Sequence, residues 1–252
     1  VTSIGSGCFS NNSYIKAVTI PDSVTNIEAD AFASCSALSE IHIGSGVTNV
    51  DREAFYNCEA LASFSVDSAN PQYSSKDGVL FNKQQTELLQ YPQGKAETDY
   101  TIPTSVNSIA DYAFSPCSTL VNITIPSNVV TIGASAFEYC SSLCNVTIDN
   151  GVTRIKENAF SSCESLLNIT IPSSVISIGD YAFSGCFSLT NLNLPNSITH
   201  IGNGAFEASG LISIIIPGSV ECLENGIFYR CDSLENITIE NGVTTIGTEA
   251  FS

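Results

Sequence analysis

The sequence has little positive charge and contains neither methionine nor tryptophan. Only 8 lysines and arginines stand against 25 aspartates and glutamates, which gives a formal net charge of −17. Nucleic acids and anionic membranes bind proteins through clusters of Lys and Arg, so a surface of this charge would be repelled by both. The composition therefore excludes nucleic acid as an expected partner.

Long hydrophobic runs are also missing. No stretch of 18 or more apolar residues occurs, so we expect no membrane insertion in this segment. The chain opens with Val-Thr-Ser-Ile, which has neither the basic start nor the apolar stretch of a signal peptide, and no initiating methionine precedes it. We therefore expect a segment excised from a longer protein, whose targeting signals lie outside it.

Side chains for catalysis or metal binding are few and scattered. The only two histidines, His42 and His200, lie in distant parts of the repeat array and cannot share a site. The sequence has no Cys-x-x-Cys pair of the kind that binds zinc, no EF-hand loop and no Gly-rich phosphate loop. We therefore predict no catalytic residue, no metal and no cofactor, and we do not expect an enzyme.

What the sequence does contain is a repeat with a period of 23 residues. Its marker is the phenylalanine that in most repeats follows an alanine: Phe9, Phe32, Phe55, Phe114, Phe137, Phe160, Phe183, Phe206, Phe228 and Phe251. A cysteine usually follows three residues after this marker and a leucine six residues after it. Branched apolar residues follow at nine and eleven, as in Ile123 and Ile125, and a proline often comes next. Such a period indicates a solenoid.

The chemistry of the repeat predicts how each coil folds. Leu-x-x-Ile-x-Ile alternates apolar and polar residues as a short strand does, and proline ends it. Ala-Phe-x-x-Cys is expected to form one helical or 3₁₀ turn. One coil has about six core side chains, each worth roughly 1.5–3 kcal/mol. Ordering its residues costs roughly 1–2 kcal/mol apiece, so coils must stack to fold.

The predicted fold is therefore a repeat solenoid of the leucine-rich-repeat type. We expect a right-handed coil with a parallel β-sheet on the concave face, and short strands or 3₁₀ turns on the convex side. Residues 1–252 would form a single leucine-rich repeat domain of about ten 23-residue repeats. The repeat is interrupted near residues 70–92, where Gly78–Phe81 and Leu88–Tyr91 flank a polar loop, and a β-hairpin-like insertion is expected there.

With these positions assigned, the chain resembles the BspA-like leucine-rich repeat family. The motif Leu-x-x-Ile-x-Ile-Pro-x-x-Val-x-x-Ile-Gly-x-x-Ala-Phe-x-x-Cys carries the resemblance and is nearly intact over Leu120–Cys140 and Leu166–Cys186. The insertion from Asn70 to Phe81 also looks like a segment of these proteins. The resemblance implies an extracellular or cell-surface location, in host-associated bacteria or protists, and adhesion to host or microbial molecules.

Ten cysteines are present, and seven of them occupy the same repeat position. Those seven should form an inward-facing ladder with neighbours about 5 Å apart, the spacing of adjacent strands. Parallel side-chain directions disfavour the dihedral angle of a disulfide, so we expect buried thiols that act as small hydrophobic groups. Cys8, Cys144 and Cys222 lie outside this ladder and are the better candidates for reactive thiols.

Two columns of outward-facing strand residues are the candidate ligand-binding surface. They come from positions eight and ten after each marker, which alternation places opposite the core. The candidates are Glu40, His42, Asn122, Thr124, Asn145, Thr147, Asn168, Thr170, Asn191 and Asn193. The alternative is that these positions are only solvated, with threonine favoured by its β propensity and asparagine by side-chain ladders.

Taken together, the sequence predicts a non-catalytic adhesion module that is a monomer and recognises an extracellular protein or glycan ligand. The first alternative is a structural stalk or spacer that displays other domains. A hydrolase with unrecognised carboxylates and an ice-binding array of threonines are two further alternatives.

Overall fold

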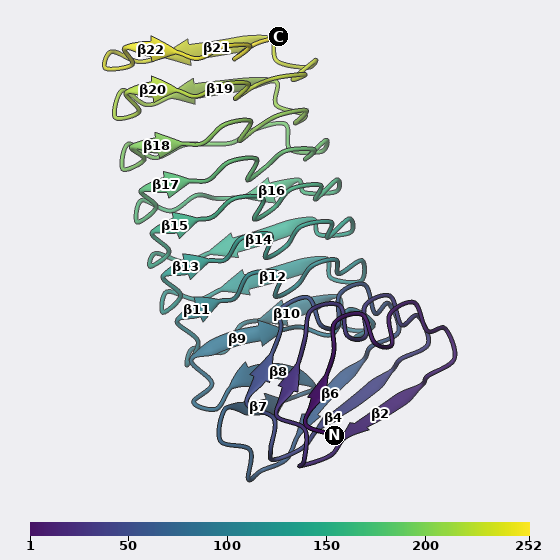
Figure 1. Ribbon diagram of the computed structural model, residues 1–252. Helices are drawn as coiled ribbons and strands as arrows, with labels where there is room; N and C mark the ends of the chain where they lie inside the picture. Colours follow the sequence, from purple (N-terminus) through teal and green to yellow (C-terminus); the bar gives the residue numbers. More distant parts are fainter.

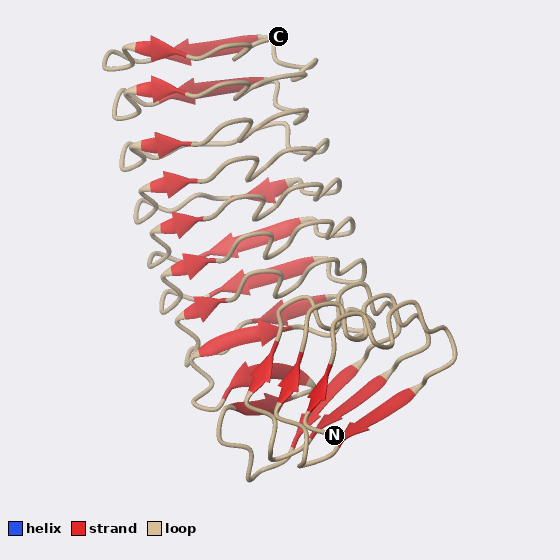
Figure 2. Cartoon of the chain, viewed as in Figure 1, coloured by secondary structure: helices blue, strands red, loops and turns tan.

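The computed structural model describes all residues 1–252 as a solenoid of short β-strands without any helix (Figures 1 and 2). Most coils place one strand on each of two faces. We call the first the long-strand face: β2 (Ala17–Ile20), β4 (Glu40–Ile43), β6 (Ser63–Val66), β10 (Asp99–Thr101), β12 (Asn122–Ile125), β14 (Asn145–Ile148), β16 (Asn168–Ile169), β19 (Ser213–Ile216) and β21 (Asn236–Ile239).

The opposite side, the short-strand face, is built mostly from two-residue strands. These are β1 (Ser3–Ile4), β3 (Asn26–Ile27), β5 (Asn49–Val50), β9 (Glu87–Gln90), β11 (Ser108–Ile109), β13 (Thr131–Ile132), β15 (Arg154–Ile155), β17 (Ser177–Ile178), β18 (His200–Ile201), β20 (Cys222–Leu223) and β22 (Thr245–Ile246). Only β7 (Tyr73–Lys76) and β8 (Val79–Asn82) lie outside this pattern.

Strand pairing follows the repeat directly. Asn122 lies opposite Asn145, and Asn145 lies opposite Asn168, in parallel strands. The same register joins Ile109 to Ile132 and onward on the short-strand face. Because the sequence period equals the length of one coil, equivalent residues stack on each other. The predicted parallel-stranded solenoid is confirmed.

A column of stacked aromatic rings runs through the core. Neighbouring rings are 4.6 to 5.9 Å apart between centroids and close to parallel, a favourable offset geometry. The column contains Phe9, Phe32 and Phe55 and then, after a break, Tyr91, Phe114, Phe137, Phe160, Phe183, Phe206, Phe228 and Phe251. Phe55 does not stack on Tyr91 but packs edge-on against Phe64. The aromatic column is therefore continuous within each part and is interrupted once, between Phe55 and Tyr91.

The Ala-Phe-x-x-Cys segments form turns, and the expectation of a helical or 3₁₀ turn is wrong. In the coil of Phe137, Ser135 and Tyr139 have positive φ angles of 51° and 59°, which no helix tolerates. The backbone N–H groups of all three residues donate to carbonyl groups of the next coil, at 2.8 to 2.9 Å. The N–H groups between them donate to carbonyl groups three residues earlier in the same coil, so bonds between coils alternate with isolated turn bonds.

The cysteine ladder is buried, as predicted, for Cys35, Cys58, Cys117, Cys140, Cys163 and Cys186, and Cys231 is partly covered. All but Cys117 donate a hydrogen bond from Sγ to the carbonyl oxygen of an aromatic residue in the preceding coil, as in the 3.3 Å bond from Cys140 to Phe114. Burial raises the pKa of the Cys58 and Cys186 thiols to about 12 and also raises the pKa of Cys140 and Cys163. These thiols stay protonated in the folded chain at neutral pH.

The segment from Asn70 to Pro92 divides the solenoid into two blocks. Here β7 pairs antiparallel with β8, and β8 pairs antiparallel with β9, which then pairs in parallel with β11. Consequently β1, β3 and β5 form one sheet, β7, β8, β9 and the short strands from β11 to β18 form another, and β20 pairs separately with β22. On the long-strand face, β6 and β10 are likewise not paired with each other. Figure 1 shows the strands of the first block inclined to those of the second.

Candidate binding surfaces

The long-strand face of the second block presents a regular array of uncharged polar side chains. Ile123, Ile125 and Val146 point into the core, which leaves the residues between them outside. Thr124 lies opposite Thr147 across β12 and β14, and Thr147 is exposed. This arrangement forms a strip of hydroxyl and carboxamide groups.

The asparagines of this strip form a hydrogen-bonded ladder. Asn122 donates to Asp99 at 2.7 Å, Asn145 to Asn122 at 2.6 Å, and Asn168 to Asn145 at 2.7 Å. The bonds from Thr98 and Asn122 lower the pKa of the Asp99 carboxyl, so it stays ionised at the end of the ladder. The amides of Asn122 and Asn145 each use one N–H and one oxygen lone pair in the ladder, and each keeps one N–H and one lone pair for solvent or a ligand.

The strip becomes irregular towards its C-terminal end. Thr170 follows directly after β16, and Asn191 is joined to Ser213 by a single bridge outside the named strands. Asn193 is exposed and lies outside any strand. The candidates from Asn122 to Asn193 therefore share one face, but only those on β12, β14 and β16 are held in a continuous sheet.

Glu40 and His42 are separated from the other candidates. Both lie on β4, whose sheet contains only β2, β4 and β6. The Nδ1 atom of His42 is 3.0 Å from the Ser65 hydroxyl on β6, and Glu40 is exposed. The insertion thus divides the ten predicted residues into two groups on different sheets.

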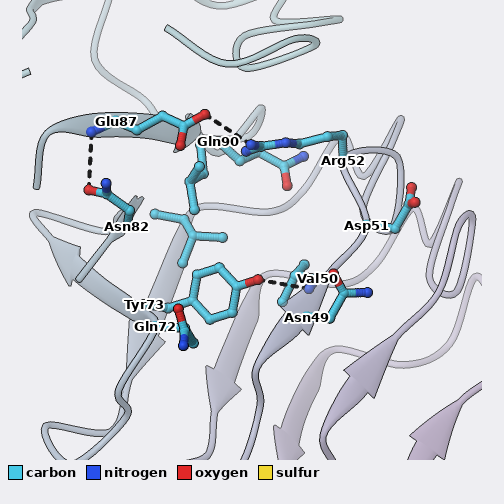
Figure 3. Close-up of a pocket in the computed structure, with 11 residues that line it drawn as sticks. Asn49, Val50, Asp51, Arg52, Gln72, Tyr73, Asn82, Glu87 and Gln90 are labelled. Atoms are coloured by element: carbon cyan, nitrogen blue, oxygen red, sulfur yellow. Dashed lines mark hydrogen bonds and ion pairs between the residues drawn. The ribbon is translucent and has the colours of Figure 1, made fainter. Parts of the chain in front are cut away.

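A second feature, which sequence reasoning missed, is a cavity of about 380 Å³ at the junction of the two blocks. We call it the junction pocket; it lies between β5 and the inserted strands β7, β8 and β9, and Figure 3 shows its lining. On one wall, Arg52 forms an ion pair with Glu87 at 2.9 Å. Leu80 and Leu89 supply apolar surface.

The pocket exists because β5 has no partner strand on its second edge. The N–H of Val50 donates instead to the Tyr73 hydroxyl at 2.9 Å (Figure 3). Asn82 is fixed in place, since its Oδ1 accepts bonds from the N–H groups of Thr86 and Glu87. Because the Tyr73 hydroxyl takes the place of a partner strand at this edge of β5, a cavity remains between the two blocks.

Gln90 is the unusual residue of this pocket. It is only 6% exposed, and its carboxamide makes no hydrogen bond within the chain. It also stands before Tyr91, at the position that is alanine in most other coils, such as Ala113 and Ala136. This departure from the repeat was the one sequence signal that could have identified the pocket.

The structure contains no group of three or more His, Cys, Asp or Glu side chains arranged to hold a metal ion. It also contains no helix that is long and apolar enough to cross a membrane.

Comparison with known proteins identifies the repeat. The sequence matches the family described as BspA type leucine rich repeat region, in six copies, over residues 2–93, 91–176 and 155–252. No curated protein matches the chain.

Solved structures share the fold. A leucine-rich repeat protein from T. pallidum is 30% identical with a TM-score of 0.61, covering 72% of this chain and 85% of that one. A leucine-rich cell surface protein from Faecalibacterium prausnitzii is 27% identical with a TM-score of 0.66, and the match covers 90% of this chain and 60% of that one. A leucine-rich repeat protein from Bacteroides ovatus, 24% identical with a TM-score of 0.62, matches over 100% of this chain and 68% of its own length and shows the fold alone.

Proposed function

Because this chain belongs to the BspA-type leucine-rich repeat family, we propose that it is a non-catalytic binding module at the cell surface or in the extracellular space. Its ligand is an extracellular protein or glycan, bound along the long-strand face of the second block. One relative with a similar fold is a cell surface protein, which supports the location. Nucleic acid is not a ligand, because the net charge of −17 opposes it.

The observation that carries this proposal is the ordered strip on β12, β14 and β16. Its asparagine ladder fixes the amides in one orientation, and each inner amide keeps a free donor and a free acceptor. A preorganised array loses little entropy when a ligand binds. The exposed Thr147 hydroxyl lies in the middle of this array, with Thr124 opposite it on β12 and Thr170 directly after β16.

The ladder also favours a second function, that of a structural spacer. Hydrogen bonds between equivalent asparagines of successive coils stabilise the solenoid whether or not a ligand binds. In this case the chain would hold another domain at a distance, as a stalk does.

A binding panel separates the two functions. Immobilised extracellular matrix proteins and glycans are probed with the chain, with a Thr124→Ala/Thr147→Ala/Thr170→Ala variant and with a Glu40→Ala/His42→Ala variant. We expect at least one ligand to bind the chain and to bind the threonine variant more weakly. If no version binds any member of the panel, the binding function is contradicted and the spacer function is supported.

A further inference from the structure

The carboxamide of Gln90 is the strongest sign of a ligand site outside the long-strand face. The Gln90 residue is only 6% exposed and its amide has no partner within the chain, but the amide atoms are not fully enclosed and are therefore open to the cavity. Most other coils have alanine at this position, so the repeat itself does not require a polar side chain here. A glutamine that is 94% buried and lines a cavity is therefore placed to hydrogen-bond something that enters the cavity.

The backbone around Gln90 directs this side chain towards the cavity. Phe81 lies opposite Leu88, but Leu80 lies opposite Gln90, so Leu89 is an extra residue in β9. Such a β-bulge changes the direction of the side chains that follow it. Leu89 and Gln90 thus both line the junction pocket, and Figure 3 shows Gln90 near the Arg52–Glu87 ion pair.

The other walls define what the pocket can hold. Arg52 is neutralised by Glu87, and Asp51 leaves one net negative charge, which disfavours an anionic ligand. Asn49 donates its amide N–H to Asn26 and keeps lone-pair capacity on its oxygen. Gln90 offers both a donor and an acceptor, and Leu80 and Leu89 offer apolar contact.

We propose that the junction pocket binds one uncharged sugar residue of a glycan. A pyranose ring presents hydroxyl groups that both donate and accept, beside C–H faces that pack on apolar side chains, and these match the two kinds of wall. The volume of about 380 Å³ is within the range of small-molecule sites and accommodates a single ring. The choice of a glycan as ligand rests on the proposed binding function, but the junction pocket is a different surface from the long-strand face.

The test uses free sugars and the intact chain. D-glucose, D-galactose, D-mannose and N-acetyl-D-glucosamine are titrated by ligand-observed NMR, with D-glucuronate as the anionic counterpart of glucose. We expect at least one neutral sugar to bind with a dissociation constant on the order of 1 mM, as is reasonable for a ligand of about 12 heavy atoms. Glucuronate should bind more weakly than glucose.

Two variants connect binding to Gln90. Gln90→Leu keeps the volume and removes the amide, and Gln90→Ala restores the residue common in other coils; each should weaken sugar binding about tenfold. Neither variant should have a lower melting temperature, because the Gln90 amide makes no hydrogen bond within the chain. If Gln90 had a purely structural role, both variants would be less stable. His200→Ala, at an exposed position of the short-strand face that does not line the pocket, should leave sugar binding unchanged.

The proposal is overturned if no neutral sugar binds at about 20 mM, far above the expected constant. It is also overturned if Gln90→Leu binds sugars as the chain does, or if glucuronate binds more tightly than glucose. The proposed function fails separately, when changes on the long-strand face leave binding to the protein and glycan panel unaffected.

Discussion

Buried thiols are the most numerous ionisable groups in the core, and their chemistry is set by the repeat. Each ladder cysteine follows an aromatic residue by three positions and is covered by the coils on either side. Desolvation disfavours the thiolate, so burial raises the pKa of Cys186 to about 12 from an ordinary value of 9.0. These residues serve as hydrophobic groups, whereas Cys8 is exposed and chemically available.

This shift predicts how stability depends on pH. In the unfolded chain thiols ionise near pH 9, but in the folded chain Cys186 stays protonated to about pH 12. Its contribution to stability is therefore complete below pH 9 and is lost as the pH rises from 9 to 12. Denaturant unfolding of the chain and of Cys186→Ala measures the difference. Between pH 9 and 11 the variant's free energy of unfolding should fall less steeply, by about 1 kcal/mol per pH unit.

An equal slope for both proteins would show that Cys186 titrates normally in the fold. A Cys8→Ala variant is the matched control, because it removes a thiol from an exposed position instead of a buried one.

Strands of only two to four residues are too short to be stable alone, and side-chain ladders reinforce them. On β12, β14 and β16 the asparagine amides add a second row of hydrogen bonds to the backbone pairing. At the insertion, by contrast, the Tyr73 hydroxyl replaces a missing strand for Val50. The elements therefore depend on their neighbours in the stack more than on their own sequence.

The ladder can be tested with one pair of substitutions. Asn145→Ala removes bonds to both Asn122 and Asn168 and should destabilise the chain by about 1–2 kcal/mol. Asn191→Ala occupies the same repeat position, but the Asn191 amide bonds only the adjacent Thr190. It should cost less than about 0.5 kcal/mol, the usual range for surface substitutions. Equal losses in urea unfolding would show that the ladder contributes no stability.

At the scale of the molecule, the solenoid consists of two blocks with interrupted backbone pairing. The insertion breaks both sheets and the aromatic column, while apolar side chains still form one cluster of 65 buried residues. In a repeat protein, each coil is stabilised by its interfaces with the neighbouring coils. We therefore expect unfolding to be less cooperative between the two blocks than between coils of the same block.

Hydrogen exchange should reveal the two blocks. Phe32→Ala removes a stacked ring from the first block, a change that costs roughly 3–5 kcal/mol. We expect faster exchange in β1 to β6 and unchanged protection from β11 onward. The matched variant Phe160→Ala should loosen coils on both sides of it, since pairing there is continuous. Equal loss of protection in both blocks for Phe32→Ala would contradict this division.

The sequence was sufficient to predict the stacked coils, because one period of 23 residues determines which residues lie opposite each other. It could not predict the turn around Phe137, whose left-handed residues Ser135 and Tyr139 donate their N–H groups to carbonyl groups of the next coil. It also could not predict the junction pocket, because Val50, Tyr73 and Glu87 come together only where β5 loses a partner. The sequence does show a glutamine at a position that is alanine in most coils, but only the structure shows that Gln90 lines a cavity.

The most direct test of the binding function is the affinity of one panel ligand for two single-site variants. Thr147→Arg places a bulky side chain in the middle of the long-strand face, and His200→Arg places the same side chain at an exposed position of the short-strand face. We predict that Thr147→Arg raises the dissociation constant at least about tenfold, equivalent to roughly 1.4 kcal/mol, while His200→Arg leaves it unchanged. Equal affinity of both variants and the unaltered chain would contradict binding on the long-strand face.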